Sequence, residues 1–264
     1  MTRSLLDALR GARIYDLSQP YYVGMPHYPT HPPFLYSLSK RHGDYINPGG
    51  SSSAAEAIAL GTHVGTHMDA LCHFSDGGML RGGVPAEGRQ SYTGGVQHLS
   101  IDTTPPFLRR GILLDVAAHA GREALPENFS VTAEVFEAVQ GAQGVEICEG
   151  DVVLIRTGWG RLFDDAKRFI NGVRGPGPEL GGARWLSARK PFAVGSDTVA
   201  FEKTPSPEMR VHVHLLVESG IHILEALNLE ELARDRVWEF LFIGAPLKIR
   251  GATGAPLRPI AVVV

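Results

Sequence analysis

The sequence predicts a mixed α/β fold in a single domain. Short apolar runs rich in β-branched residues recur along the 264 residues, and helical patterns fall between several of them. No Ser/Gly-rich or highly charged linker divides the chain. A chain of this length buries roughly three quarters of its unfolded surface, so one sizeable core is expected. We therefore expect one domain over residues 1–264, with a mixed sheet and flanking helices.

The strand predictions rest on apolar runs that end at Gly, Pro or polar residues. Several runs are almost continuously apolar, which is typical of strands buried on both faces. The expected strands are Arg13–Leu17, Ala55–Leu60, Gly111–Val116, Asp151–Arg156, Phe192–Ser196, His222–Glu225, Trp238–Ile243 and Ile260–Val264.

The clearest helical pattern begins after Thr132. The hydroxyl of Thr132 is a suitable N-cap, and Phe136 and Val139 lie on one apolar stripe of the helix that follows. Further helices are expected at Gly181–Arg189, Glu208–Ser219 and Leu229–Arg234.

Two segments do not match a regular element. Residues 20–50 are rich in Pro and aromatic residues, which predicts a long irregular arm that packs on the body or on a neighbouring subunit. Gly172–Gly182 is a second loop, rich in Gly and Pro, and is expected to line a pocket.

Charge and composition exclude several functions. The chain has 25 Lys and Arg against 28 Asp and Glu, with no basic stripe, so nucleic acid is not an expected partner. No apolar run has the length of a membrane span, and the N-terminal residues lack the apolar stretch of a signal peptide. Cys72 and Cys148 form no CxxC pair, which favours a reduced, cytoplasmic setting.

The densest group of potential metal ligands is His63, His67, Asp69 and His73. Imidazole and carboxylate are suitable ligands for Zn²⁺ and Mn²⁺. On a straight helix Asp69 would face away from both His63 and His67, and on a straight strand His63 and Asp69 would lie about 20 Å apart. The spacing therefore predicts a bent loop that turns through Gly65, because glycine tolerates a positive φ. His73 could remain uncoordinated and act as a base.

A second cluster contains His212, His214 and Glu225. On a helix His212 and His214 would point about 160° apart, so only one of them can face a given site. Glu225 ends an apolar strand, where a carboxylate needs a cation or hydrogen bonds. Taken alone, this cluster is consistent with a structural role, but together with the first it suggests one binuclear centre.

Other catalytic patterns are missing. Val64 occupies the position of the Glu in HExxH, which argues against a zincin, and the chain contains no GxSxG, P-loop or strand-associated GxGxxG. A serine hydrolase and a nucleotide-binding protein are therefore not expected.

The segment His63-x-Gly-Thr-His67-x-Asp69-x-x-x-His73-Phe74 resembles the signature of the metal-dependent cyclase family, which includes bacterial kynurenine formamidase and isatin hydrolase. The resemblance implies a swivelling β/β/α fold, a homodimer or tetramer, and hydrolysis of amide or related acyl bonds with Zn²⁺ or Mn²⁺. It extends over nearly the whole chain, through Asp16-Leu-Ser, Leu154-Ile-Arg-Thr-Gly-Trp159, His212-x-x-Leu-Leu, Ile223-Leu-Glu225 and Ala245-Pro-Leu-Lys-Ile.

The resemblance also implies residue roles. His63, His67 and Asp69 would bind metal and His73 would be the catalytic base. His212 and Glu225 match positions that complete the site, and in the formamidases they bind a second metal. Their separation is one residue longer here than in the formamidase pattern, which implies a bulge or the participation of His214.

These observations predict a metal-dependent hydrolase of a small cyclic or aryl amide, such as an isatin-like or N-formyl aromatic compound. His73 would move protons, and Glu225 would bind metal or help to protonate the leaving group. Trp159 and the aromatics Tyr21, Tyr22, Tyr28 and Phe34 are candidate walls for a flat substrate. A lactone hydrolase with the same site and a non-catalytic metal-binding protein are the alternatives.

Overall fold

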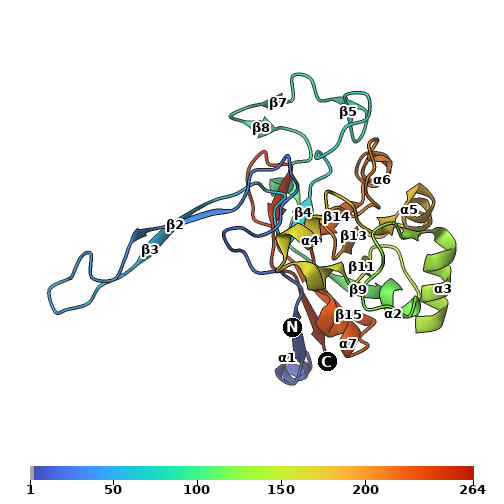
Figure 1. Cartoon of the computed structure of the whole chain (residues 1–264), viewed down its shortest axis with the longest axis horizontal. Helices are drawn as coiled ribbons and strands as arrows, with labels where there is room; N and C mark the ends of the chain where they lie inside the picture. The colour runs from blue at the N-terminus through green and yellow to red at the C-terminus, as the bar shows by residue number, and fades with distance from the viewer. Residues whose placement is uncertain (1–2) are drawn as a thin grey trace.

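The computed structural model describes residues 3–264, and its main element is a nine-stranded mixed sheet (Figure 1). The strand order across the sheet is β1-β17-β15-β9-β11-β13-β14-β4-β16. The strands are β1 (Arg13–Asp16), β4 (His67–Asp69), β9 (Phe107–Asp115), β11 (Val152–Arg156), β13 (Ala193–Ser196), β14 (His222–Glu225), β15 (Glu239–Gly244), β16 (Gly254–Pro256) and β17 (Ile260–Val263).

The centre of the sheet is parallel and its two sides are antiparallel. Strands β9, β11, β13 and β14 run parallel to one another. Antiparallel strands β15, β17 and β1 extend the sheet on one side, and β4 and β16 extend it on the other. The predicted mixed α/β fold is thereby confirmed, although the sequence did not predict the short strands β4 and β16.

Both faces of the sheet are covered by apolar side chains. Along β11, Val152 and Leu154 belong to one core cluster, whereas Val153 and Ile155 belong to another. A strand buried on both faces needs apolar residues at every position. This explains why the predicted strands read as continuous apolar runs.

The four predicted helical segments are helical in the structure, with one difference, and α1, α2 and α4 were not predicted. Thr132 caps α3 by accepting a hydrogen bond from the Val135 amide, as predicted. Residues Val213–Ser219 of the predicted helix Glu208–Ser219 form a π-helix. The helices are α1 (Arg3–Arg10), α2 (Val116–His119), α3 (Ala133–Gln143), α4 (Ala166–Ile170), α5 (Leu180–Ser187), α6 (Arg210–His212) and α7 (Glu230–Arg234), with 3₁₀ turns at Ile101–Thr103 and Trp159–Leu162.

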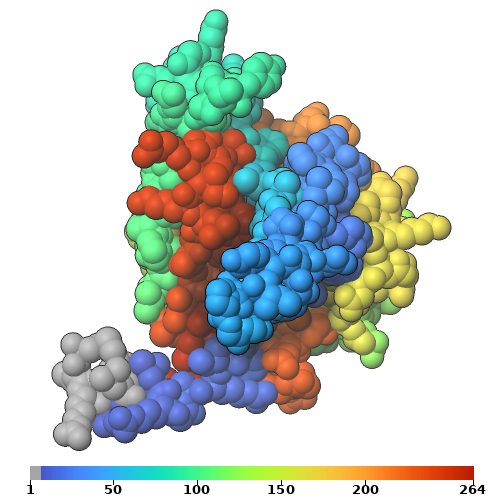
Figure 2. All heavy atoms as spheres, turned by 90° about the vertical axis from the view of Figure 1, so that its left-hand side faces the viewer, coloured from blue at the N-terminus to red at the C-terminus, as the bar shows by residue number. Residues whose placement is uncertain are grey.

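Residues 20–50 differ from the irregular arm that the sequence predicted. They contain β2 (Leu35–Lys40), which pairs with β3 (Ala55–Ala59) in a two-stranded ribbon. The ribbon projects far from the body in Figure 1 and toward the viewer in Figure 2. The cross-strand partners Tyr36 and Ile58 are 48% and 59% exposed. The prediction of irregular structure from proline content was therefore wrong for residues 35–40. The prolines flank β2 and do not interrupt it.

Three smaller ribbons complete the described structure. The predicted loop Gly172–Gly182 contains one of these strands and the start of α5. The ribbons pair β5 (Met79–Leu80) with β6 (Val84–Pro85), β7 (Gln90–Ser91) with β8 (Gly95–Val96), and β10 (Ser130–Val131) with β12 (Gly177–Pro178).

No helix among residues 3–264 combines the length and the apolar character required to cross a membrane.

Candidate metal centre

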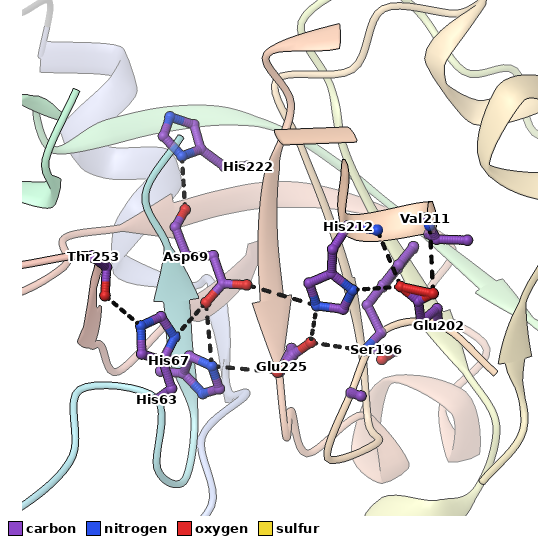
Figure 3. A network of polar contacts seen from close by, with 12 residues as sticks. His63, His67, Asp69, Ser196, Glu202, Val211, His212, His222, Glu225 and Thr253 are labelled. Carbon is purple, nitrogen blue, oxygen red and sulfur yellow. Dashed lines mark hydrogen bonds and ion pairs between the residues drawn. The ribbon is translucent and has the colours of Figure 1, made fainter. Parts of the chain in front are cut away.

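Strand β4 brings the two predicted clusters together. It lies between β14 and β16, and its register places His67 opposite Glu225 and Asp69 opposite Ile223. His67 and Asp69 are two residues apart on a strand, so both side chains point to the same face. Figure 3 shows the two side chains directed toward Glu225 of β14 and His212 beyond it.

The turn before β4 is bent as the sequence predicted. Gly65 has a φ of +65°, and a Cβ atom at this position would lie 2.6 Å from the Met25 side chain and 2.8 Å from the Tyr21 ring. The bend places His63 Nδ1 2.7 Å from Asp69 Oδ1. His63 fits there because Gly254 lacks a side chain, since a Cβ atom would lie 2.5 Å from the His63 ring.

The hydrogen bonds of His67 leave one nitrogen free. Its Nδ1 lies 2.8 Å from the Gly65 carbonyl oxygen, so this nitrogen carries the proton and donates it. Its Nε2 lies 3.4 Å from both Asp69 Oδ1 and Glu225 Oε2. His67 Nε2 and Asp69 Oδ2 are buried without a hydrogen-bond partner among the described residues. Buried polar atoms normally have partners, so this pair marks a position where a cation would find ligands.

His212, and not His214, faces the centre. Nδ1 of His212 donates to Glu202 Oε1 at 2.8 Å, and its Nε2 lies 3.1 Å from Glu225 Oε1 and 4.0 Å from Asp69 Oδ2. His214 points elsewhere, since its Nδ1 contacts the Glu218 carboxylate at 2.6 Å. A histidine that donates one ring proton to a carboxylate and exposes the other nitrogen is the usual form of a metal ligand.

The π-helix explains the spacing between His212 and Glu225. A π-helix holds one more residue per hydrogen-bonded turn than an α-helix, and such bulges occur mostly at functional sites. The π-helix Val213–Ser219 lies between the two residues. This wider backbone is the kind of bulge that the longer spacing implied.

Burial and charge perturb the ionisation of the cluster. Burial lowers the pKa of His67, but the nearby carboxylates of Asp69 and Glu225 outweigh it and raise the value to about 10. Glu202 and Glu225 do the same for His212, whose pKa also reaches about 10. Burial raises the pKa of Glu225, but the histidines outweigh this effect and lower it to about 2. In the metal-free chain the carboxylates therefore hold protons on nitrogens that a divalent cation would occupy instead.

The donor set suits one or two divalent cations. One ligand atom from each of His63, His67 and Asp69 lies within 4.8 Å of the others, and the same holds for Asp69, His212 and Glu225. Asp69 belongs to both groups. Imidazole and carboxylate donors in these numbers match Zn²⁺ and Mn²⁺ better than softer metals, which prefer thiolates.

His73 lies beside the centre but outside both ligand groups. Its ring stacks on that of His63 with 3.9 Å between the centroids. Burial lowers the pKa of His73 to about 3, so the ring is neutral. The structure thus places the predicted base next to the predicted ligands.

A cavity of about 190 Å³ opens onto the centre. Of the predicted aromatic walls only Tyr28 lines it, and Phe74 supplies a second aromatic ring. Trp159 is instead buried in the core, where its indole N–H donates to the Leu125 carbonyl. The lining residues are Tyr28, Thr30, His31, His63, His73, Phe74, Val199, Ala200, Met209, His212 and Glu225.

Sequence reasoning missed the residues that orient the ligands. Glu202 holds His212, the Thr253 hydroxyl lies 2.9 Å from Nε2 of His63, and His222 contacts the Asp69 carbonyl at 2.9 Å. A carboxylate following the apolar run Val199–Phe201 was a usable signal for Glu202. Thr253 carried no such signal.

Comparisons with known proteins agree with this arrangement. The model of the cyclase family matches residues 15–203. The chain is 27% identical to isatin hydrolase of Roseibium aggregatum over 214 residues, which cover 78% of this chain and 73% of that protein. It is 24% identical to kynurenine formamidase of Bordetella petrii over 249 residues, or 94% of this chain and 97% of that protein.

Solved structures are similar over the full length. A crystal structure described as a novel cyclase superposes with a TM-score of 0.89 at 28% identity, covering 100% of this chain and 92% of the other. Isatin hydrolase A from Ralstonia solanacearum superposes with a TM-score of 0.78 at 26% identity, covering 100% and 99%.

Proposed function

Because the chain belongs to the cyclase family, we propose that it is a metal-dependent hydrolase that cleaves the C–N bond of a small cyclic or aryl amide. The family and the general class of hydrolase agree with the sequence prediction. One observation carries the further proposal: two buried polar atoms without partners, His67 Nε2 and Asp69 Oδ2, lie in a cluster of imidazoles and carboxylates beside a cavity.

The proposed metal ligands are the five converging residues. His63, His67 and Asp69 would hold one ion, and Asp69, His212 and Glu225 would hold a second. A bound Zn²⁺ or Mn²⁺ lowers the pKa of water toward about 7 and polarises the substrate carbonyl.

The protein residues then move the protons. Neutral His73 accepts a proton as water adds to the carbonyl carbon, and it delivers that proton to the nitrogen as the C–N bond breaks. Glu225 faces the cavity, so its free oxygen can hold or return a proton in the same step. Phe74 packs against His212 with 5.0 Å between ring centroids and provides an apolar wall for a flat substrate.

Relatives named isatin hydrolase and kynurenine formamidase support a cyclic or N-formyl aryl amide as substrate. The test is metal analysis of protein purified without chelator, followed by assays with isatin, N-phenylformamide and an aryl lactone. We expect amide hydrolysis that a chelator abolishes and Mn²⁺ or Zn²⁺ restores. Preference for the lactone would favour the ester-cleaving alternative, and no hydrolysis of any of the three would favour a non-catalytic metal-binding protein.

We also propose a homo-oligomer, a dimer or tetramer, that covers the β2–β3 ribbon. Isolated two-stranded ribbons are marginally stable in water, and this one exposes the apolar side chains of Leu35, Leu38 and Ile58. A second copy of the chain would bury these residues and give the ribbon the packing it lacks within one subunit.

A further inference from the structure

We propose that the substrate is electrically neutral: the cavity accepts an uncharged amide and rejects an amide that carries a carboxylate. This inference rests on the proposed function and narrows it to one substrate class. It follows from the chemistry of the cavity wall and from the position of the nearest cations.

The wall offers no permanent positive charge to a substrate. None of the residues that line the cavity in the described chain is a lysine or an arginine. The nitrogen-bearing side chains of the wall are histidines: His31 and His73 pack against the His63 ring, and His212 belongs to the ligand cluster. Away from the histidines and Glu225, the lining consists of apolar, hydroxyl and aromatic side chains: Tyr28, Thr30, Phe74, Val199, Ala200 and Met209.

The two cations that flank the lining residues in sequence are engaged elsewhere. Arg210, which follows Met209, pairs with Glu218 at 2.9 Å and with Asp76 at 3.4 Å. The Lys203 ammonium donates to the Ser130 hydroxyl at 2.9 Å. Neither group lines the cavity, so neither is available to a substrate carboxylate.

Apart from the cations of the proposed function, the fixed charges at the inner end of the cavity are negative. Asp69 and Glu225 are buried carboxylates, and Glu202 lies behind His212. A substrate carboxylate would therefore lose its water against Phe74 and Val199 without gaining a lysine or arginine as partner. It would find positive charge only at the ligand cluster itself, where it would compete with the carbonyl that must react.

The test compares matched compounds that differ only in charge. Isatin and N-phenylformamide are each assayed beside a ring-carboxylate analogue and the methyl ester of that analogue, which has similar size without the charge. For the scaffold that is hydrolysed, we expect the ester to stay within about tenfold of the parent in kcat/KM and the acid to lose at least about 100-fold. Equal hydrolysis of acid and ester would overturn the inference.

A substitution at the cavity supplies the missing cation. Met209 is half-buried, so the ammonium of Met209→Lys can stay hydrated while reaching the substrate. We expect Met209→Lys to raise kcat/KM for the acid at least tenfold relative to the ester, whereas the uncharged control Met209→Gln should leave that ratio unchanged. An acid-to-ester ratio that is the same in both variants would contradict the role of charge.

Measuring how tightly the acids and esters bind distinguishes failure of this inference from failure of the proposed function. If no compound is hydrolysed, the hydrolase proposal fails, but calorimetry of the same esters and acids with the metal-loaded protein still tests the charge preference. Weaker binding of the acid than of the ester supports the inference. Equal or tighter binding of the acid overturns it.

Discussion

Individual hydrogen bonds decide which nitrogen of each histidine faces the centre. The Gly65 carbonyl, the Glu202 carboxylate and the Thr253 hydroxyl each contact one ring nitrogen of a different histidine. The other nitrogen of each ring is thereby directed toward the carboxylates. Partners of this kind fix the tautomer and ring orientation of metal-binding histidines.

The first prediction concerns Glu202. Glu202→Ala should weaken metal binding by about 10- to 100-fold, because Nδ1 of His212 loses its acceptor. Glu202→Gln keeps an acceptor oxygen and should restore part of the affinity. Titration against a competing chelator measures both, with the exposed Glu208→Ala as the control. Unchanged affinity in Glu202→Ala would show that Glu202 does not orient the ligand.

The second prediction separates the base from the ligands. His73→Ala should retain its metal but lose about 10²- to 10⁴-fold in kcat, since a general base is removed without a ligand. His67→Ala should lose metal as well as activity. Elemental analysis and steady-state kinetics on both variants test this. Full turnover by His73→Ala would discard the base assignment.

At the residue scale the sequence predicted what lies close together along the chain. His63, His67, Asp69 and His73 were recognisable because spacing alone excludes a straight helix and a straight strand. Thr253 could not be predicted, because its contact with His63 spans 190 positions and one hydroxyl among many carries no local signal.

Single elements position the centre through unusual backbone geometry. Strand β4 has three residues, yet it pairs on both sides. The turn before it depends on Gly65, and the π-helix sets the approach of His212. These features are local departures from regular structure at a functional site.

The third prediction tests the turn. Gly65→Ala should lower the free energy of unfolding by about 1 to 3 kcal/mol, because its φ is positive and its Cβ would overlap Tyr21 and Met25. Gly141→Ala is the matched control, because Gly141 lies in α3 with open space around it. It should gain about 0.5 to 1 kcal/mol. Urea denaturation measures both values, and equal effects of the two substitutions would contradict the strained turn.

At the element scale, strands with an apolar composition could be predicted from the sequence. Strands that form only because they pair with neighbouring strands could not. Composition identified β11 and the second half of β9, which are apolar, but not Phe107–Arg110, which contains two arginines. β4 consists of His, Met and Asp, and only its neighbours make it a strand. β2 was missed for two reasons. Prolines surround it, and a projecting ribbon has no buried face that would require an alternating apolar pattern.

In the whole molecule, the candidate metal centre joins distant parts of the chain. Its proposed ligands come from residues 63–69 and 212–225. A cation that binds only the assembled site stabilises the folded state in proportion to the logarithm of its concentration.

The fourth prediction follows from this linkage. Saturating Mn²⁺ or Zn²⁺ at about 1,000 times its Kd should stabilise the fold by about 4 kcal/mol, seen as a higher Tm. EDTA should reverse the shift, and His67→Ala should show little of it. A Tm that does not change with metal in the wild-type chain would contradict a cation site in the native state.

The fifth prediction concerns the ribbon. Replacing the cross-strand partners in Tyr36→Lys/Ile58→Lys should shift the chain toward a smaller species in sedimentation velocity, because charged side chains would have to be buried between subunits. Leu108→Lys, at an exposed apolar residue outside the ribbon, is the control. A wild-type chain that sediments as a monomer would refute the proposed oligomer.

The position of β4 between β14 and β16 also determines when the centre can form during synthesis. Residues 67–69 leave the ribosome early, but their neighbours in the sheet are residues 222–225 and 254–256. We infer that the histidines of residues 63–67 lack their sheet neighbours until residues 222–225 and 254–256 have been translated. Metal capture by the signature loop alone would lack Glu225 and His212, so complete loading is expected to follow the folding of these later segments.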